Sequence, residues 1–168
     1  TKALDRICVA DVDIYLVVGY PETTAEGVYN ALTVLRSSEV IAGYRKQCLP
    51  NYQVFDERRY FRAGSQPCVI NIAGARMAFT VCEDLWEPEP ALQAKEAGAD
   101  LLVNINASPF HMRKLQERQE LVQQRSREGG FPVVYVNLVG GQDELVFDGG
   151  SMAASQGELN CPIPQFQE

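Results

Sequence analysis

The sequence predicts an α/β fold, because strand-like and helix-like segments alternate along its second half. Apolar runs of strand length and helix-like segments follow one another in the order 68–72, 76–82, 88–97, 100–106, 111–128 and 131–139. A strand, a helix and a strand in succession imply a parallel crossover, since parallel strands need a connection of helical length. At 168 residues and 46% hydrophobic composition, the chain can build one sizeable core, so we expect one domain.

The first part of the chain predicts a strand followed by a hairpin. The run 13–19 is rich in residues that favour strands and ends at the turn signal Gly19-Tyr20-Pro21. The runs 28–35 and 39–46 flank the polar turn 36–38, which predicts the hairpin.

Lys46 closes the second strand of this hairpin. It shares the parity of Val40, Ala42 and Tyr44, so it lies on the face that carries apolar groups. Residues 49–64 then show neither a helix period nor a strand period, and we predict a shaped loop there. Ordered loops of this kind often carry function.

The second half begins with another predicted hairpin, formed by 68–72 and 76–82. The helix at 88–97 starts with prolines in its first turn and stops at Gly98. The strand 100–106 follows.

The helix at 111–128 ends at Gly129-Gly130. A loose apolar stripe along this helix comprises Met112, Leu115, Leu121 and Val122. After the strand 131–139, short β segments are expected at 144–147 and 151–154.

Cys82 lies at the junction of the strand 76–82 and the helix that follows. Met77, Phe79 and Val81 alternate with smaller residues, so Cys82 faces a space that its small neighbours leave open. A reactive group just past the carboxyl end of a strand is typical of α/β proteins. The alternative is that Cys82 is a small apolar filler, the usual role of an unpaired cysteine.

Composition excludes several classes of function. The net charge is −7 and basic residues form only short pairs, so we expect no nucleic-acid partner. With a single histidine and scattered thiols, we expect no metal site. The five cysteines show no disulfide framework, and no apolar run has membrane length, which favours a cytoplasmic protein without a membrane partner.

The segment Cys82-Glu83-Asp84-Leu85-Trp86 resembles the nucleophile motif of the nitrilase (carbon–nitrogen hydrolase) superfamily. Its form is similar to that in the glutaminase domains of glutamine-dependent NAD synthetases. The match runs through nearly the whole chain, at 18–21, 29–30, 44–46, 49–52, 55–61, 82–86, 108–110 and 140–151. The resemblance implies a nitrilase-like α-β-β-α sandwich, here lacking its opening strand-helix-strand segment, in a partial carbon–nitrogen hydrolase domain that spans 1–168.

The resemblance also implies the catalytic groups. Cys82 would be the nucleophile, and Lys46 would stabilise the tetrahedral oxyanion together with the backbone N–H of Glu83. Glu57 would orient the lysine and help proton transfer. From the residues alone, the favoured interpretations are a solvated lysine at a strand end for Lys46 and an acidic residue of a surface loop for Glu57.

Substrate contacts follow from the same resemblance. Tyr52 would line a glutamine pocket, Trp86 would wall that pocket or cap the core, and Ser108 would bind the polar end of the substrate. Arg113 or Arg118 would bind the α-carboxylate, which suits a bidentate guanidinium. For His111, the alternatives are a Cys–His pair or a local hydrogen bond.

The expected function of the parent protein is hydrolysis of glutamine, which supplies ammonia for ATP-dependent NAD synthesis. The synthetase domain is absent from this sequence. ATP and Mg belong to that domain, the glutaminase half needs no cofactor, and we expect a homo-oligomer. The family's general-base glutamate lies in the missing opening segment, so we expect this chain alone to be inactive. The alternatives are a free-standing nitrilase-family amidase and a catalytically inactive fragment or assembly module.

Overall fold

A computed structural model describes residues 7, 13–37, 39–52, 54–160 and 162–167 of the chain. The chain divides into two compact units, 1–68 and 69–168, and each is described by itself. Ser38 of the predicted turn lies outside the described residues, as do Cys8 and Cys161.

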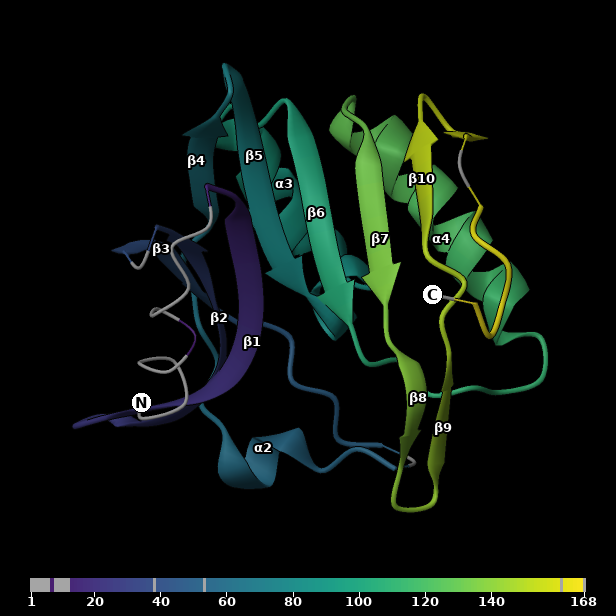
Figure 1. The fold of residues 1–168 in the computed structure, drawn as a ribbon, viewed down its shortest axis with the longest axis horizontal. Coiled ribbons are helices and arrows are strands. Elements are labelled where there is room, and N and C mark those ends of the chain that lie inside the picture. Colours follow the sequence, from purple (N-terminus) through teal and green to yellow (C-terminus); the bar gives the residue numbers. More distant parts are fainter. Residues whose placement is uncertain (1–6, 8–12, 38, 53, 161, 168) are drawn as a thin grey trace. The chain divides into compact units, whose positions relative to one another are not determined.

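The first unit contains an antiparallel sheet in the order β1-β2-β3 (Figure 1). Its strands are β1 (Tyr15–Thr24), β2 (Gly27–Arg36) and β3 (Glu39–Arg45). The predicted hairpin is confirmed by β2 and β3. The prediction that the first strand ends at Gly19 is wrong, because β1 continues to Thr24 and Pro21 pairs with Asn30. In the described sheet β1 is an edge strand, where a proline costs no ladder hydrogen bond if its nitrogen faces outward.

A register shift in β3 alters the face predicted for its apolar residues. Val40 pairs with Leu35 while Ala42 pairs with Val34, so the parity changes between them. Val40 is consequently 64% exposed, whereas Lys46 is 1% exposed. The buried position predicted for Lys46 is confirmed, and that for Val40 is wrong because of the bulge.

The loop after β3 is held against the sheet by backbone hydrogen bonds. Lys46 N donates to Asn30 O at 2.8 Å, and Gly64 N donates to Lys46 O at 2.8 Å. A Cβ atom at Gly64 would lie 2.1 Å from the Arg45 carbonyl oxygen, so this approach requires glycine. The one-turn helix α2 (Glu57–Tyr60) was not predicted, because four residues are too few to show a helical period.

The second unit contains a mixed sheet in the order β11-β10-β7-β6-β5-β4 (Figure 1). Its strands are β4 (Cys68–Ile72), β5 (Ala75–Val81), β6 (Leu101–Asn106), β7 (Val133–Asn137), β10 (Met152–Ser155) and β11 (Glu158–Leu159). β5, β6 and β7 are parallel, which confirms the predicted crossover. A separate hairpin is formed by β8 (Val139–Gln142) and β9 (Leu145–Asp148).

Two helices cover one face of this sheet, α3 (Pro88–Glu96) and α4 (Lys114–Gly129) (Figure 1). The hydrophobic core, where these helices pack on the sheet, includes Leu85, Leu102, Val122 and Tyr135. None of the helices in the described part of the chain has the length and apolar character needed to cross a membrane.

The start predicted for the second helix is wrong. α4 begins at Lys114 rather than His111, because Arg113 has a left-handed φ of 70° that cannot continue a helix. Met112 therefore lies before the helix and is 76% exposed, so it does not belong to the predicted apolar stripe. Leu121 and Val122 are buried as predicted.

Candidate active site

Cys82 occupies a sharp turn at the carboxyl end of β5. The strand ends at Val81, and Cys82 begins the 3-10 helix η1 (Cys82–Leu85) with a φ of 49°. A positive φ is unusual for a non-glycine residue, and such strained positions cluster at functional sites. The turn therefore presents a partly exposed thiol at the place where an α/β sheet positions reactive groups.

Buried polar groups hold this turn in place. The Asp84 carboxylate is fully buried and accepts a 3.0 Å hydrogen bond from Val81 N. The Asn104 amide donates to Thr80 Oγ1 at 3.0 Å and to the Cys82 carbonyl at 3.5 Å. The side chain that supports the nucleophile turn thus comes from the neighbouring strand.

Arg125 of α4 donates hydrogen bonds to the backbone carbonyls at the end of η1. Its Nε donates to Leu85 O at 2.8 Å, and its Nη2 donates to Trp86 O at 2.7 Å. Arg125 was missed by the sequence reasoning. A signal was present, because Arg118 and Arg125 are spaced to share a helix face with Val122, and charged residues at such positions need buried partners.

Arg118 joins two distant segments of the second unit. Its Nη1 donates to the two Asp148 carboxylate oxygens at 2.8 and 3.0 Å, and both side chains are 0% exposed. Its Nη2 donates to the carbonyls of Ser108 and Pro109, each at 2.9 Å. Arg118 therefore has no exposed donor for a substrate carboxylate.

Ser108 is buried within this cluster. Its backbone N–H donates to Asn137 Oδ1 at 2.9 Å, and Asn137 Nδ2 donates to Gly149 O at 2.9 Å. The segment that carries Ser108 is thus fixed from both sides, by Arg118 and by Asn137.

Trp86 packs against the core of the second unit and also contacts a cation. The Lys114 ammonium lies 3.8 Å from the centre of the Trp86 ring and 3.1 Å from Glu117 Oε2. No role was predicted for Lys114, because the α-carboxylate was assigned to Arg113 or Arg118. Arg113 and His111 are both exposed beside it.

In the first unit, the structure brings Lys46 and Glu57 into direct contact. Lys46 Nζ lies 2.6 Å from Glu57 Oε1, with the two side chains 1% and 16% exposed. Asn30 Nδ2 also donates to Glu57 Oε2 at 3.4 Å. A buried lysine needs such a partner, so Glu57 fixes the position of the ammonium group.

Tyr52 lies in the loop between these two residues and is 50% exposed. Its ring meets that of Phe55 edge-on, with 6.0 Å between the centroids. The Lys46–Glu57 pair and Tyr52 lie in the first unit, and the thiol, Glu83, Trp86 and Ser108 lie in the second.

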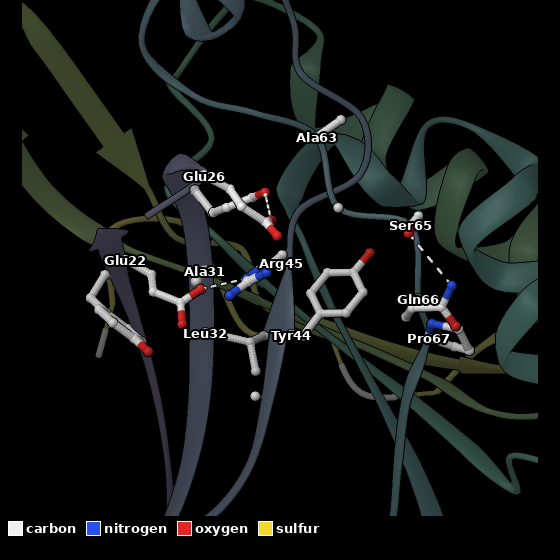
Figure 2. A pocket seen from close by; sticks show the side chains of 14 residues that line it. Glu22, Glu26, Ala31, Leu32, Tyr44, Arg45, Ala63, Ser65, Gln66 and Pro67 are labelled. Atoms are coloured by element: carbon white, nitrogen blue, oxygen red, sulfur yellow. Dashed lines mark hydrogen bonds and ion pairs between the residues drawn. The ribbon is translucent and has the colours of Figure 1, made fainter. Parts of the chain in front are cut away.

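A hollow of about 440 Å³ also lies in the first unit, beside β3 and the segment 63–67 (Figure 2). Arg45 points into it, donates to Glu22 Oε2 at 2.6 Å and lies 4.2 Å from the Tyr29 ring centroid. Lys46 and Glu57 do not line this hollow. Arg45 and Lys46 are consecutive and project to opposite faces, so the hollow is separate from the lysine.

The described residues contain no group of three or more histidine, cysteine, aspartate or glutamate side chains that could hold a metal ion.

Comparison with known proteins identifies the family. Residues 4–168 match the family model described as carbon-nitrogen hydrolase. The chain is 46% identical over 155 residues to a glutamine-dependent NAD(+) synthetase of Xanthomonas campestris. This alignment covers 91% of this chain and 28% of that protein. It is 43% identical over 171 residues to the enzyme of the same name from Aquifex aeolicus, covering 99% of this chain and 30% of that protein.

Solved structures share the fold. A glutamine-dependent NAD+ synthetase from Acinetobacter baumannii in complex with ADP superimposes with a TM-score of 0.94 at 34% identity, over 99% of this chain and 32% of that chain. A nitrilase-superfamily amidase from Nesterenkonia superimposes with a TM-score of 0.86 at 26% identity. The match covers 97% of this chain and 63% of that chain. A variant of that amidase carries the acetamide moiety of fluoroacetamide covalently added at its active site cysteine. The nitrilase-like fold predicted from the sequence is confirmed, and the chain spans about a third or less of the synthetases that it matches.

Proposed function

The chain belongs to the carbon-nitrogen hydrolase family, and from this premise we propose that it is the amide-cleaving part of a glutamine-dependent NAD synthetase. The observation that carries the proposal is the left-handed turn at Cys82, which presents a thiol in the place that the superfamily motif assigns to its nucleophile. The identity to synthetases over 91–99% of this chain supports glutamine as the substrate.

The proposed reaction begins with attack of the Cys82 thiolate on the carboxamide carbon of glutamine. A C–S bond forms, and the carbonyl oxygen takes up the negative charge. Lys46 and the backbone N–H of Glu83 stabilise this oxyanion, a contribution worth about 3–4 kcal/mol per donor in comparable sites. Glu57 holds the ammonium group of Lys46 at its place, which the 2.6 Å contact supports.

The tetrahedral intermediate collapses with cleavage of the C–N bond. The departing NH2 group takes the proton that the Cys82 thiol gave up when it became the thiolate and leaves as ammonia, while the glutamyl group stays on sulfur as a thioester. Water then attacks the thioester carbon, which releases glutamate and returns the thiol.

For substrate recognition, the proposal keeps the residues that the family resemblance implies. Tyr52 and Trp86 would contact the aliphatic part of glutamine, and Ser108 its polar end. The α-carboxylate would bind Arg113 or Lys114 rather than Arg118, because Asp148 and two backbone carbonyls already occupy both Arg118 terminal nitrogens.

The partner in this proposal is a synthetase domain of the same protein, which would consume the ammonia. ATP and Mg would serve that domain, and the glutaminase half would need no cofactor. A homo-oligomer in the cytoplasm completes the proposal.

The second candidate is a free-standing amidase. The similarity to the Nesterenkonia amidase at a TM-score of 0.86 supports it, because that structure shares the fold without being named a synthetase. A catalytically inactive assembly module is the third candidate, and it predicts no amide cleavage at all.

The test uses the complete protein that contains this chain, with NAD formation measured from glutamine and from added ammonia. We expect Cys82→Ala to abolish the glutamine-dependent reaction and to leave the ammonia-dependent reaction nearly intact. Loss of both reactions in a folded variant would refute this division of labour. Absence of NAD formation with either nitrogen source, together with release of ammonia from simple amides, would establish the amidase instead.

A further inference from the structure

Residues 163–167, which we call the strap, lie against the connection between β9 and β10 (Figure 1). Phe166 N donates to Asp148 O at 2.8 Å, and Gln165 forms an antiparallel bridge with Gly149. These backbone contacts hold the strap on the second unit. They also place the Gln165 side chain beside Asp148, the last residue of β9.

Gln165 adds a neutral donor to a buried ion pair. Its Nε2 donates to Asp148 Oδ2 at 2.6 Å, and Arg118 Nη1 donates to the two oxygens of the same carboxylate at 2.8 and 3.0 Å. Asp148 and Arg118 are both 0% exposed, whereas Gln165 is partly exposed. Hydrogen bonds to a charged carboxylate are strong and orient it. Gln165 therefore helps to fix the carboxylate that orients the Arg118 guanidinium.

The guanidinium in turn holds the backbone of the segment 108–110. Arg118 Nη2 donates to the carbonyl oxygens of Ser108 and Pro109, each at 2.9 Å. The donors of a guanidinium form a rigid planar fork, so Nη2 must move when Nη1 follows a displaced carboxylate. The position of 108–110 therefore depends on the carboxylate that Gln165 helps to fix.

A second contact joins the strap to the same segment. The ring of Phe166 lies 5.8 Å from the ring of Phe110, centroid to centroid, in a tilted arrangement typical of aromatic pairs. The strap thus reaches 108–110 by two routes, a ring contact and a chain of hydrogen bonds through a buried ion pair.

The segment 108–110 follows a strand that ends beside the nucleophile turn. β6 ends at Asn106 and runs parallel to β5, with Ile105 paired to Val81, the residue before Cys82. Both strands therefore end at the same edge of the sheet, where α/β proteins bind their ligands. A substrate held at the Cys82 sulfur would lie close to this edge.

We propose that the strap positions the substrate-binding segment 108–110, and that Gln165 is the main positioning residue. The inference rests on the proposed function, in which Ser108 binds the polar end of glutamine. Gln165 acts through Asp148 and Arg118 rather than on the substrate. Its loss would displace the segment and weaken its contacts with glutamine, because such contacts depend on exact placement.

The first test measures backbone hydrogen exchange in the complete protein and compares Gln165→Leu with the unmutated chain. Leucine has a similar size and removes the donor to Asp148. We expect the amides in peptides that cover 107–112 to exchange about tenfold faster, the scale of one lost hydrogen bond to a charged group, while those of β5 stay unchanged. Unchanged exchange at 107–112 would overturn the proposal.

The second test separates binding from chemistry in the same variant. Steady-state ammonia release should show KM for glutamine raised about tenfold, with kcat changed less than about twofold, because the segment binds the substrate equally in its ground and transition states. A purely structural role would instead reduce the amount of active protein, and so lower kcat at constant KM. That result, or unchanged kinetics, would overturn the proposal.

Gln167→Leu is the matched control, because Gln167 lies on the same strap and is exposed. It should leave KM and the exchange at 107–112 unchanged. Changes as large as those of Gln165→Leu would show that any substitution in the strap has this effect and would overturn the proposal.

Phe166→Leu keeps the proposal testable if Gln165→Leu does not fold. Phe166 is 58% exposed, so its replacement should not prevent folding, and it removes the ring contact with Phe110. We expect KM for glutamine to rise about threefold and the exchange at 107–112 to become faster. If neither changes, the strap does not position the segment.

Failure of the proposed function would give a different result. If the unmutated protein released no ammonia from glutamine, the glutaminase assignment would be refuted. The exchange comparison needs no substrate, so it would still decide whether the strap holds 108–110.

Discussion

Each unit of this chain contains a buried cation paired with a carboxylate, and the two pairs differ in how completely their partners enclose them. In the second unit, Arg118 and Asp148 are both 0% exposed, and backbone carbonyls occupy the other terminal nitrogen of Arg118. In the first unit, Lys46 is 1% exposed but Glu57 is 16% exposed. Protein groups occupy both terminal nitrogens of Arg118, which points to a role in the fold, whereas the carboxylate that pairs with Lys46 reaches solvent. We propose that Lys46, unlike Arg118, acts on a ligand.

The largest effect is expected from breaking the enclosed pair. Arg118→Met leaves Asp148 buried without a counter-charge, which typically costs about 3–5 kcal/mol of folding free energy. Denaturant unfolding measures this loss. Arg127→Met on the exposed side of the same helix is the control and should change the unfolding free energy by less than about 0.5 kcal/mol. A loss for Arg118→Met no greater than that of the control would show that the pair does not support the fold.

For the Lys46–Glu57 pair, we expect a large effect on turnover and a smaller effect on stability. Lys46→Gln is expected to lower glutamine turnover at least about a hundredfold, because an oxyanion donor is lost. Its cost in stability should be smaller than that of Arg118→Met, because Glu57 can reach solvent. Steady-state ammonia release and denaturant unfolding of the same sample separate the two effects. Turnover within a few-fold of the unmutated protein would make Lys46 a structural residue like Arg118.

The backbone that positions Lys46 offers a third way to sharpen the contrast. Gly64→Ala places a Cβ 2.1 Å from the Arg45 carbonyl oxygen, so the segment that bonds Lys46 must move. We expect a loss of about 1–3 kcal/mol, the usual cost of overpacking. Gly43→Ala is a matched control in the same unit, since its Cβ meets only Leu32 O at an ordinary 3.7 Å. Equal melting temperatures for the two variants would contradict this account of the loop.

The smallest effect is expected at the exposed cations near Trp86. Lys114→Met removes a contact worth about 0.5–1 kcal/mol at a surface, so stability should scarcely change. If Lys114 binds the α-carboxylate, KM for glutamine should rise about tenfold, equivalent to a single weakened ionic contact, while kcat changes little. Arg113→Met is the paired variant. The substitution that raises KM identifies the ligand, and no change in either would exclude both residues.

The sequence predicted the order of elements well where the hydrophobic period was long. The parallel crossover after Cys82 and the hairpin that ends at Lys46 were both predicted from the apolar runs and from the turn or helix signals between them. The errors arose where a backbone angle or a register shift decided the outcome. Arg113 delays the start of α4 through a left-handed φ, and the bulge in β3 turns Val40 outward, and neither feature leaves a mark on the apolar pattern.

The candidate site was predicted unevenly. Contact between Lys46 and Glu57 was implied by family resemblance, whereas spacing alone could not bring a strand end and a loop acid together. Arg118 was expected to bind substrate because an arginine suits a carboxylate. The carboxylate that it binds is Asp148, which lies far along the sequence, and only the fold brings the two together.

The central claim is that Cys82 is the nucleophile in amide cleavage, and trapping the covalent intermediate tests it most directly. The complete protein is mixed with glutamine, quenched in acid during turnover and digested with trypsin. We predict that the peptide 77–95 carries a glutamyl group in thioester linkage, that hydroxylamine removes it, and that Cys82→Ala abolishes it. Steady ammonia release from glutamine with no adduct on this peptide, or with the adduct on another residue, would contradict the claim.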